Sequence, residues 1–286
     1  MKKVLITGVN SYVGNSFETW LNQYPDEYIV EKTSLRDDSW KEKDFSNYDS
    51  IVHVAGIAHR KETKKNEQLY YKVNRDLAYN VAKKAKNEGI SHFLFLSSMS
   101  VYGIVTGIID SDTIPKPKSN YGKSKLQAEK LIDSLQDESF KVATLRPPMI
   151  YGKNCKGNYQ RLANIALRIP VFPDIQNRRS MIYVDNLSEL MKNIIDSMSN
   201  GLFYPQNKEY VNTSKLVWQI AQVNGRNIKL TKLFNPLIKN VNHTTINKVF
   251  GELIYDQNLS KNEKDYNIVD FVKSIYLTEN MGNRLK

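Results

Sequence analysis

The chain alternates between short, fully apolar runs and longer stretches in which apolar residues recur every three or four positions. Uninterrupted apolar runs are typical of strands buried on both faces of a parallel sheet, and the longer period is typical of helices that cover it. Up to residue 152 the two patterns take turns, which predicts a doubly wound parallel α/β sheet. The expected strands are KKVLIT (2–7), EYIVEKTS (27–34), DSIVHVAG (49–56), HFLFLSS (92–98) and KVATLRPP (141–148), and the expected helices cover 15–22, 67–88 and 121–135.

The alternation loosens after residue 152, where short helical patterns mix with loops rich in Asn and Lys. We interpret 1–152 as a dinucleotide-binding domain and segments 153–177 and 206–286 as a smaller substrate-binding lobe. Between these segments the chain is expected to return to the main sheet near 178–205, through MIYV and GLFYP. No linker separates independently folding parts.

Two residues in the run NYGKSKLQAEKLIDSL carry the candidate chemistry. Tyr121 and Lys125 are four positions apart, so a helix places both side chains on one face, about 6 Å apart along the axis. An unperturbed phenol has a pKa near ~10, and an ammonium group one turn away is expected to lower it toward neutrality. Ser97 and Ser98 end the preceding strand and offer a hydroxyl for a carbonyl or an alcohol. This set predicts a proton-transfer site for a carbonyl/alcohol redox reaction.

A glycine-containing loop, ITGVNSYVGNSF, joins the first expected strand to the first helix. Glycine lets the backbone approach a pyrophosphate, and the helix N-terminus supplies amide donors. The spacing fits Gly-x-x-Gly-x-x-Gly except that Ser11 occupies the middle position, where its hydroxyl can itself donate to phosphate. The residues expected to bind the cofactor here are Gly8, Asn10, Ser11, Tyr12, Val13 and Gly14.

The end of the second strand should select between NAD and NADP, because an acidic side chain there binds the ribose hydroxyls and repels a 2′-phosphate. In YIVEKTSLRDD, Glu31 lies inside the strand, and Ser34 and Arg36 occupy the tip. Arg36 can pair with a phosphate and Ser34 can hydrogen-bond to it. The pattern favours NADP(H), and NAD(H) is the alternative if Asp37 or Asp38 turns toward the ribose.

The net charge of +11 raises the question of an anionic partner, either nucleic acid or a small substrate. The lysines are scattered along helical stretches, which indicates solvated faces, so we expect no nucleic-acid binding.

The single cysteine, Cys155, excludes an internal disulfide and fits a reducing cytoplasm. The dispersed His and Cys residues predict no metal site, and the absence of a signal peptide or membrane-spanning run predicts a cytoplasmic protein without membrane insertion.

Six motifs occur together in a recognisable order: ITGVNSYVG, HVAG (53–56), LSSMSVYG (96–103), YGKSK (121–125), RPPMIYG (146–152) and RRSMIYVDNL (178–187). The chain thereby resembles the extended short-chain dehydrogenase/reductases that act on nucleotide sugars, the epimerase/dehydratase group. The resemblance implies a Rossmann-type fold and a homodimer built from helices 67–88 and 121–135. The apolar stripe that would serve this dimer, or pack inside the monomer instead, is Leu69, Val73, Leu77 and Val81.

The resemblance also implies roles for single residues. Ser98 would be the catalytic hydroxyl, Tyr121 the acid/base and Lys125 the ligand of the nicotinamide ribose. Further residues would lie beside the cofactor, namely Ser97, Ala55, Gly56, Asn74 and Pro148. A UDP-sugar substrate would be held from the second lobe by Asn158, Arg161, Arg178 and Arg179.

The two positions after Ser98 narrow the choice among the reactions of this family. Dehydratases of this family carry an Asp-Glu pair there, whereas this chain has Met99 and Ser100, which cannot perform that acid/base work. A reductase and a 4-epimerase remain. The non-acidic strand tip favours NADPH-dependent reduction of a UDP-4-keto-6-deoxy-N-acetylhexosamine in bacterial surface polysaccharide biosynthesis. The alternative is a UDP-sugar 4-epimerase with tightly held NAD.

Overall fold

The computed structural model of the chain describes residues 1–58, 62–239, 244–261 and 264–280. Its centre is a sheet of six parallel strands in the order β10-β6-β4-β3-β1-β2. The strand order reverses direction at β1 and β3, as in a doubly wound Rossmann fold, so the predicted fold class is confirmed. The strands are β1 (Lys2–Thr7), β2 (Tyr28–Thr33), β3 (Ser50–His53), β4 (His92–Leu96), β6 (Lys141–Leu145) and β10 (Gly201–Phe203).

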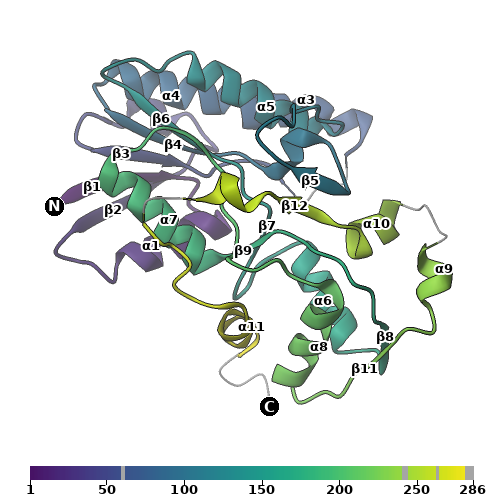
Figure 1. Cartoon of the computed structure of the whole chain (residues 1–286). Helices are drawn as coiled ribbons and strands as arrows, with labels where there is room; N and C mark the ends of the chain where they lie inside the picture. The colour runs from purple at the N-terminus through teal and green to yellow at the C-terminus, as the bar shows by residue number, and fades with distance from the viewer. Residues whose placement is uncertain (59–61, 240–243, 262–263, 281–286) are drawn as a thin grey trace.

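Helices cover both faces of this sheet (Figure 1). Side chains alternate along a strand, so Val4 and Ile6 of β1 pack into one apolar core and Leu5 into the other. The first core is closed by two helices, α1 (Tyr12–Leu21) and α7 (Val184–Ser197). The second is closed by α2 (Ser39–Glu42), α4 (Ala78–Asn87) and α5 (Asn120–Asp133).

The helix expected over 67–88 is not uniform. A 3₁₀ turn, η1 (Lys64–Asn66), and α3 (Glu67–Tyr70) lead into a π-helical segment, η2 (Tyr71–Leu77), before α4 continues. Such wide turns are frequent at functional sites. The apolar stripe along this run is divided, because Val81 is fully buried in the monomer core while Leu69 is exposed. The homodimer stays a prediction.

Only one of the two expected returns to the sheet occurs. GLF forms β10, which pairs with β6 at the sheet edge. MIY forms β9 (Met181–Tyr183), which pairs with β7 (Met149–Tyr151) in a separate two-stranded sheet, so that expectation is wrong. Pro147 and Pro148 follow β6 and cannot donate ladder hydrogen bonds, so the chain leaves the main sheet before β7. Because β9 pairs with β7, it lies outside the main sheet too.

The second lobe is built from short elements around β7 and β9. An apolar core containing Tyr151, Phe172, Val217 and Ile275 joins them. No helix in the described ranges is both long and apolar enough to span a bilayer. The elements are α6 (Asn158–Ala166), β8 (Val171–Pro173), α8 (Thr213–Val223), β11 (Lys229–Thr231), α9 (Asn235–Lys239), α10 (Thr244–Phe250), α11 (Phe271–Glu279), the pair β5 (Gly107–Ile109) and β12 (Leu253–Tyr255), and the turns η3 (Met99–Tyr102) and η4 (Gln257–Ser260).

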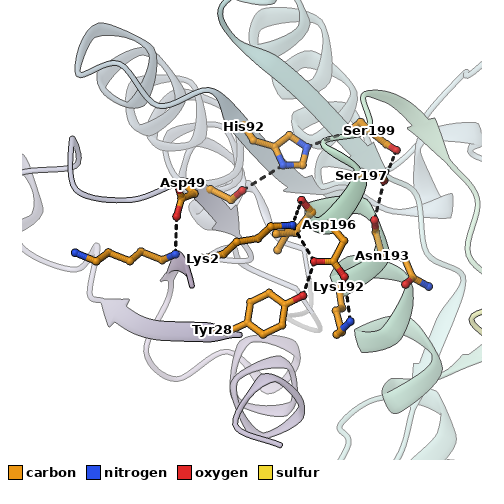
Figure 2. A network of polar contacts seen from close by, with 12 residues as sticks. Lys2, Tyr28, Asp49, His92, Lys192, Asn193, Asp196, Ser197 and Ser199 are labelled. Atoms are coloured by element: carbon orange, nitrogen blue, oxygen red, sulfur yellow. Dashed lines mark hydrogen bonds and ion pairs between the residues drawn. The ribbon is translucent and has the colours of Figure 1, made fainter. Parts of the chain in front are cut away.

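A polar network fastens α7 to the amino-terminal edge of the sheet (Figure 2). The carboxylate of Asp196 accepts hydrogen bonds from Lys2 at 2.9 Å, from Lys192 at 3.0 Å and from the hydroxyl of Tyr28. Burial by itself would raise the pKa of Asp196, but these donors lower it overall. The network lies at the edge opposite the carboxyl ends of the strands, where ligands bind in this fold class.

Candidate active site

The loop after β1 is shaped by a glycine. Gly8 has a φ of +97°, and a Cβ there would lie 3.1 Å from the Cα of Ala55. Its backbone N–H donates to the carbonyl of Thr33 at 2.9 Å, so the loop is held against the ends of both β2 and β3. This places the N-terminus of α1 at the carboxyl edge of the sheet, where Rossmann folds bind a diphosphate.

Ser11 does not disturb this loop, because its φ of −70° is open to any residue. Its hydroxyl oxygen caps α1 by accepting from the N–H of Gly14 at 3.3 Å, which leaves the hydroxyl proton available to a phosphate. Gly14 allows close packing, since a Cβ would lie 3.0 Å from Val54. The loop therefore fits a dinucleotide diphosphate. Tyr12 contributes only backbone here, because its side chain runs into the core toward Gly152.

Each acidic side chain at the tip of β2 already has a polar partner among the described residues. Glu31 accepts from Lys43 at 3.0 Å and from the Tyr48 hydroxyl at 2.6 Å. Asp37 accepts from the N–H of Ser39 at 3.0 Å, and Asp38 pairs with Lys41 at 2.9 Å. By contrast, Arg36 is exposed and forms no ion pair with any described residue, and the Ser34 hydroxyl accepts only from the N–H of Arg36 at 3.2 Å.

Asn74 joins three elements beneath the expected cofactor path. Its side chain is fully buried, accepts from the N–H of Ile57 at 2.7 Å and donates to Ser124 of α5 at 3.2 Å. A Cβ on Gly56 would lie 3.0 Å from the Asn74 oxygen and 3.5 Å from Nζ of Lys125. The segment after β3, the π-helical turn and the helix of Lys125 therefore meet at this point.

Tyr121 and Ser98 are brought together by a close helix approach. A Cβ on Gly122 would lie 2.5 Å from the carbonyl oxygen of Ser100, so only glycine lets α5 come this near to η3. The Ser98 hydroxyl forms a hydrogen bond with Tyr121. Its oxygen also accepts from the N–H of Ser100 at 3.1 Å, which orients it. The predicted hydroxyl pair is thus assembled in the structure.

Glu62 is a residue of this site that the sequence did not reveal. Its two carboxylate oxygens accept from the backbone N–H groups of Asn120 at 2.9 Å and Tyr121 at 3.0 Å. A negative charge at a helix N-terminus is stabilising, and here it fixes the backbone that carries Tyr121. Glu62 is 59 positions from Tyr121 in sequence, so no local pattern marks it.

The expected effect of Lys125 on Tyr121 is wrong. Burial raises the pKa of Tyr121, and the hydrogen bond to Ser98 only partly opposes this. The ammonium group of Lys125 instead donates to the carbonyl of Leu96 at 2.7 Å and lies 4.7 Å from the centre of the Phe95 ring. Burial lowers the pKa of Lys125 itself to about 8. Tyr121 is therefore a protonated phenol at neutral pH.

Ser97 takes part in a buried ionic cluster rather than in the hydroxyl pair. Its hydroxyl donates to Glu129, which also accepts from Nη2 of Arg146 at 2.7 Å. Arg146 donates in turn to the Tyr102 hydroxyl at 2.8 Å. Sequence analysis missed Glu129 and Arg146, although the four-residue step from Lys125 to Glu129 places both on one face of α5.

The segment after β6 lies beside the serine loop. The N–H of Met99 donates to the carbonyl of Pro147 at 2.9 Å, and Pro148 is buried next to it. The predicted cofactor-side position of Pro148 therefore borders the same edge of the sheet as Ser98. Met99 and Ser100 bring no ionisable group to this edge.

The candidate substrate residues belong to the second lobe. Asn158 and Arg161 are exposed on the first turns of α6. Arg178 is half exposed and neutralised by Glu252, with contacts of 2.7 and 2.8 Å. Arg179 is more deeply buried, donates to the carbonyl of Gly251 at 2.9 Å, and has no carboxylate partner in the described part of the chain. Burial lowers its pKa, so an anion at this position would satisfy it.

The class of protein follows from the sheet and the site together. NAD(P)-dependent short-chain dehydrogenases/reductases combine a parallel sheet and a diphosphate loop with a Tyr, a Lys and a Ser at the carboxyl edge, here Tyr121, Lys125 and Ser98. Residues 4–205 match the model of the NAD dependent epimerase/dehydratase family, and the chain belongs to that family. A UDP-glucose 4-epimerase from Vibrio cholerae is 31% identical over a 248-residue alignment, and the alignment covers 77% of this chain and 75% of that protein. The resemblance seen in the motifs is confirmed.

Solved structures agree on the fold. UDP-glucose 4-epimerase from Thermus thermophilus in complex with NAD has a TM-score of 0.73 at 18% identity, covering 96% of this chain and 97% of that chain. A dTDP-4-dehydrorhamnose reductase from Bacillus anthracis in complex with NADP has a TM-score of 0.70 at 18% identity, covering 96% and 98%. At such identity the likeness shows the fold alone, and both cofactors occur on it.

Proposed function

We propose that the chain is an NADPH-dependent reductase of the 4-keto group of a UDP-4-keto-6-deoxy-N-acetylhexosamine in bacterial surface polysaccharide biosynthesis. The end of β2 carries this proposal. Arg36 is exposed and without an ion pair among the described residues, whereas Glu31 and Asp37 are already engaged. A free guanidinium suits the 2′-phosphate of NADP, whereas a carboxylate that held the NAD ribose would first have to give up a contact it already makes.

The residues at the carboxyl edge supply the rest of the chemistry. NADPH, when bound, supplies the hydride for C4 of the sugar. The Tyr121 hydroxyl holds the proton that passes to the O4 oxygen as negative charge develops there. Ser98, oriented by the N–H of Ser100, hydrogen-bonds the same oxygen and keeps it near Tyr121. Lys125 would hold the nicotinamide ribose, and the buried Asn74 would fix the segment after β3 beside it.

The protonation state of Tyr121 also supports reduction. A 4-ketoreductase starts from the neutral phenol, which donates a proton, whereas an epimerase must first remove a proton from a hydroxyl and so starts from the phenolate. Burial raises the pKa of Tyr121, which keeps the phenol neutral at physiological pH. The second candidate, a UDP-sugar 4-epimerase with tightly held NAD, is favoured by the name of the Vibrio cholerae relative.

Cofactor kinetics test the proposal. With a UDP-4-keto sugar as substrate, we expect kcat/KM for NADPH to exceed that for NADH by at least about tenfold, because one charge-assisted phosphate contact contributes about that much. Arg36→Gln should remove most of this preference, and Lys41→Gln, which is close in sequence but paired with Asp38, should not. Copurified NAD that never exchanges, together with epimerisation of UDP-glucose, would establish the epimerase instead.

The two neighbouring arginines should differ in their effect on substrate binding. We expect Arg179→Gln to raise KM for the UDP-sugar by about tenfold or more with little change in kcat, since it removes a desolvated cation without a carboxylate partner among the described residues. Arg178→Gln is the matched control and should change KM by less than about threefold, because Glu252 already neutralises it at the surface. Equal effects in steady-state kinetics would contradict a role for Arg179 in binding an anionic group of the UDP-sugar.

A further inference from the structure

The net charge of +11 is concentrated in one part of the molecule. Segments 153–173 and 210–251 contain four and six basic residues, together ten of the 41 Lys and Arg, and none of the 30 Asp and Glu. The remainder of the chain holds 31 basic and 30 acidic residues and is nearly neutral. These two segments form α6, β8, α8, β11, α9 and α10, so the positive charge belongs to the second lobe.

The basic side chains of this lobe are free to meet an external anion. Ion pairs formed by described residues lie elsewhere, apart from the pair of Arg178 with Glu252 at the margin of the lobe. Acidic neighbours from other elements are Asp174, Glu252 and Glu279, and Glu279 is already engaged by Tyr159 and Asn224. The exposed basic residues without a described ion pair include Arg168, Arg226, Lys229, Lys232 and Lys248.

Two large, exposed apolar side chains lie next to Lys229 and Lys232 in the sequence. Leu233 is 78% exposed and Phe234 is 41% exposed, and only Lys232 separates them from the end of β11. We call this pair the apolar tip. Local contacts fix its backbone, because the N–H of Leu233 donates to the Thr231 hydroxyl at 3.3 Å and the Asn235 side chain donates to the carbonyl of Asp174 at 2.8 Å. Figure 1 shows β11 and α9 at the outer edge of the lobe, away from the main sheet.

We propose that this edge of the second lobe docks on an anionic membrane surface. The apolar tip would enter the interfacial layer while Lys229 and Lys232, on either side of Leu230 and Thr231, pair with lipid phosphates. A positively charged surface could also attract a soluble anionic substrate. Such a role would not account for the exposure of Leu233 and Phe234, because apolar side chains do not contribute to long-range attraction of an anion. A nucleic-acid backbone offers no apolar layer for them either. The proposal does not depend on which nucleotide-sugar reaction is catalysed.

Vesicle co-sedimentation of the full chain tests this docking. We expect binding to vesicles of phosphatidylcholine with phosphatidylglycerol, weak binding to phosphatidylcholine alone, and release as salt screens the lysines. The double variant Leu233→Ser/Phe234→Ser and the double variant Lys229→Gln/Lys232→Gln should each lower the partition coefficient by about tenfold. Turnover of a soluble substrate should stay unchanged in both, because none of the four residues belongs to the catalytic or binding machinery.

A matched control comes from the main sheet, outside the second lobe. Leu202 on β10 is 49% exposed, and Leu202→Ser should bind vesicles as wild type does. In a Phe234→Trp variant, the added indole emission should shift to shorter wavelength with anionic vesicles. Absence of vesicle binding, equal binding to neutral vesicles, or a tip variant that binds like wild type would each overturn the proposal and leave the basic lobe serving soluble anions or a protein partner.

Discussion

Tyr121→Phe is expected to lower kcat by about 10²–10⁴-fold while leaving the dissociation constant of the dinucleotide within about twofold. The variant keeps the aromatic ring in its buried place and removes the hydroxyl that donates the proton. Ser98 cannot take over this role, because a serine hydroxyl is a far weaker acid than a phenol. Steady-state kinetics with a 4-keto UDP-sugar give kcat, and a fluorescence titration with NADPH gives the dissociation constant.

Tyr71→Phe serves as the matched control for this experiment. The Tyr71 hydroxyl donates to Asn120 at 3.3 Å, so it contacts the same helix start without reaching the Ser98 hydroxyl. We expect this variant to keep kcat within about threefold of wild type, as for loss of one weak, partly buried hydrogen bond. Near-normal turnover of Tyr121→Phe would remove Tyr121 from the mechanism. Loss of dinucleotide affinity in the same variant would assign it to cofactor binding.

Arg146→Met is expected to lower the free energy of unfolding by about 3–5 kcal/mol. Arg146 and Glu129 are 8% and 7% exposed, and the substitution leaves the Glu129 carboxylate buried without its cation. Removing both charges should be far milder, so the double variant Glu129→Gln/Arg146→Met should recover at least half of the loss. Urea denaturation of the cofactor-free protein at neutral pH measures both values.

The double variant Glu129→Gln/Arg146→Met should also change the pH dependence of activity. Burial lowers the pKa of Lys125, and the Glu129 charge partly counteracts this by raising it. In the double variant that support is gone, so Lys125 should lose its proton at a lower pH than in the wild type, and the alkaline limit of activity should move down. A double variant as unstable as Arg146→Met would show that packing, rather than the unpaired charge, holds this part of the core.

Part of the site could be predicted from the sequence because its residues are close to one another along the chain. The helical period places Tyr121 and Lys125 on one face of α5, and the strand-loop-helix order places Gly8 and Gly14 at the diphosphate loop. The uninterrupted apolar runs located the first five strands of the main sheet. These features depend on backbone geometry within a few residues, and the structure reproduces them.

Other expectations failed or stayed open because they depend on partners far away in sequence. Sequence spacing could not show that Lys125 turns to the carbonyl of Leu96, nor that Glu252 neutralises Arg178 and leaves Arg179 without a described carboxylate partner. It also could not show that β9 leaves the main sheet to pair with β7. In each case the competing partner lies more than about twenty-five positions away.

By itself, the sequence determined the class of fold, the candidate diphosphate loop and the residues proposed to move a proton, because each is set by short-range periodicity. The tertiary structure decided their electrostatic surroundings: which phenol is buried, which arginine has no described carboxylate partner, and in which lobe the excess positive charge gathers. The physical reason is that a charge responds to burial and to every partner within a few ångströms, and folding brings those partners from distant parts of the chain.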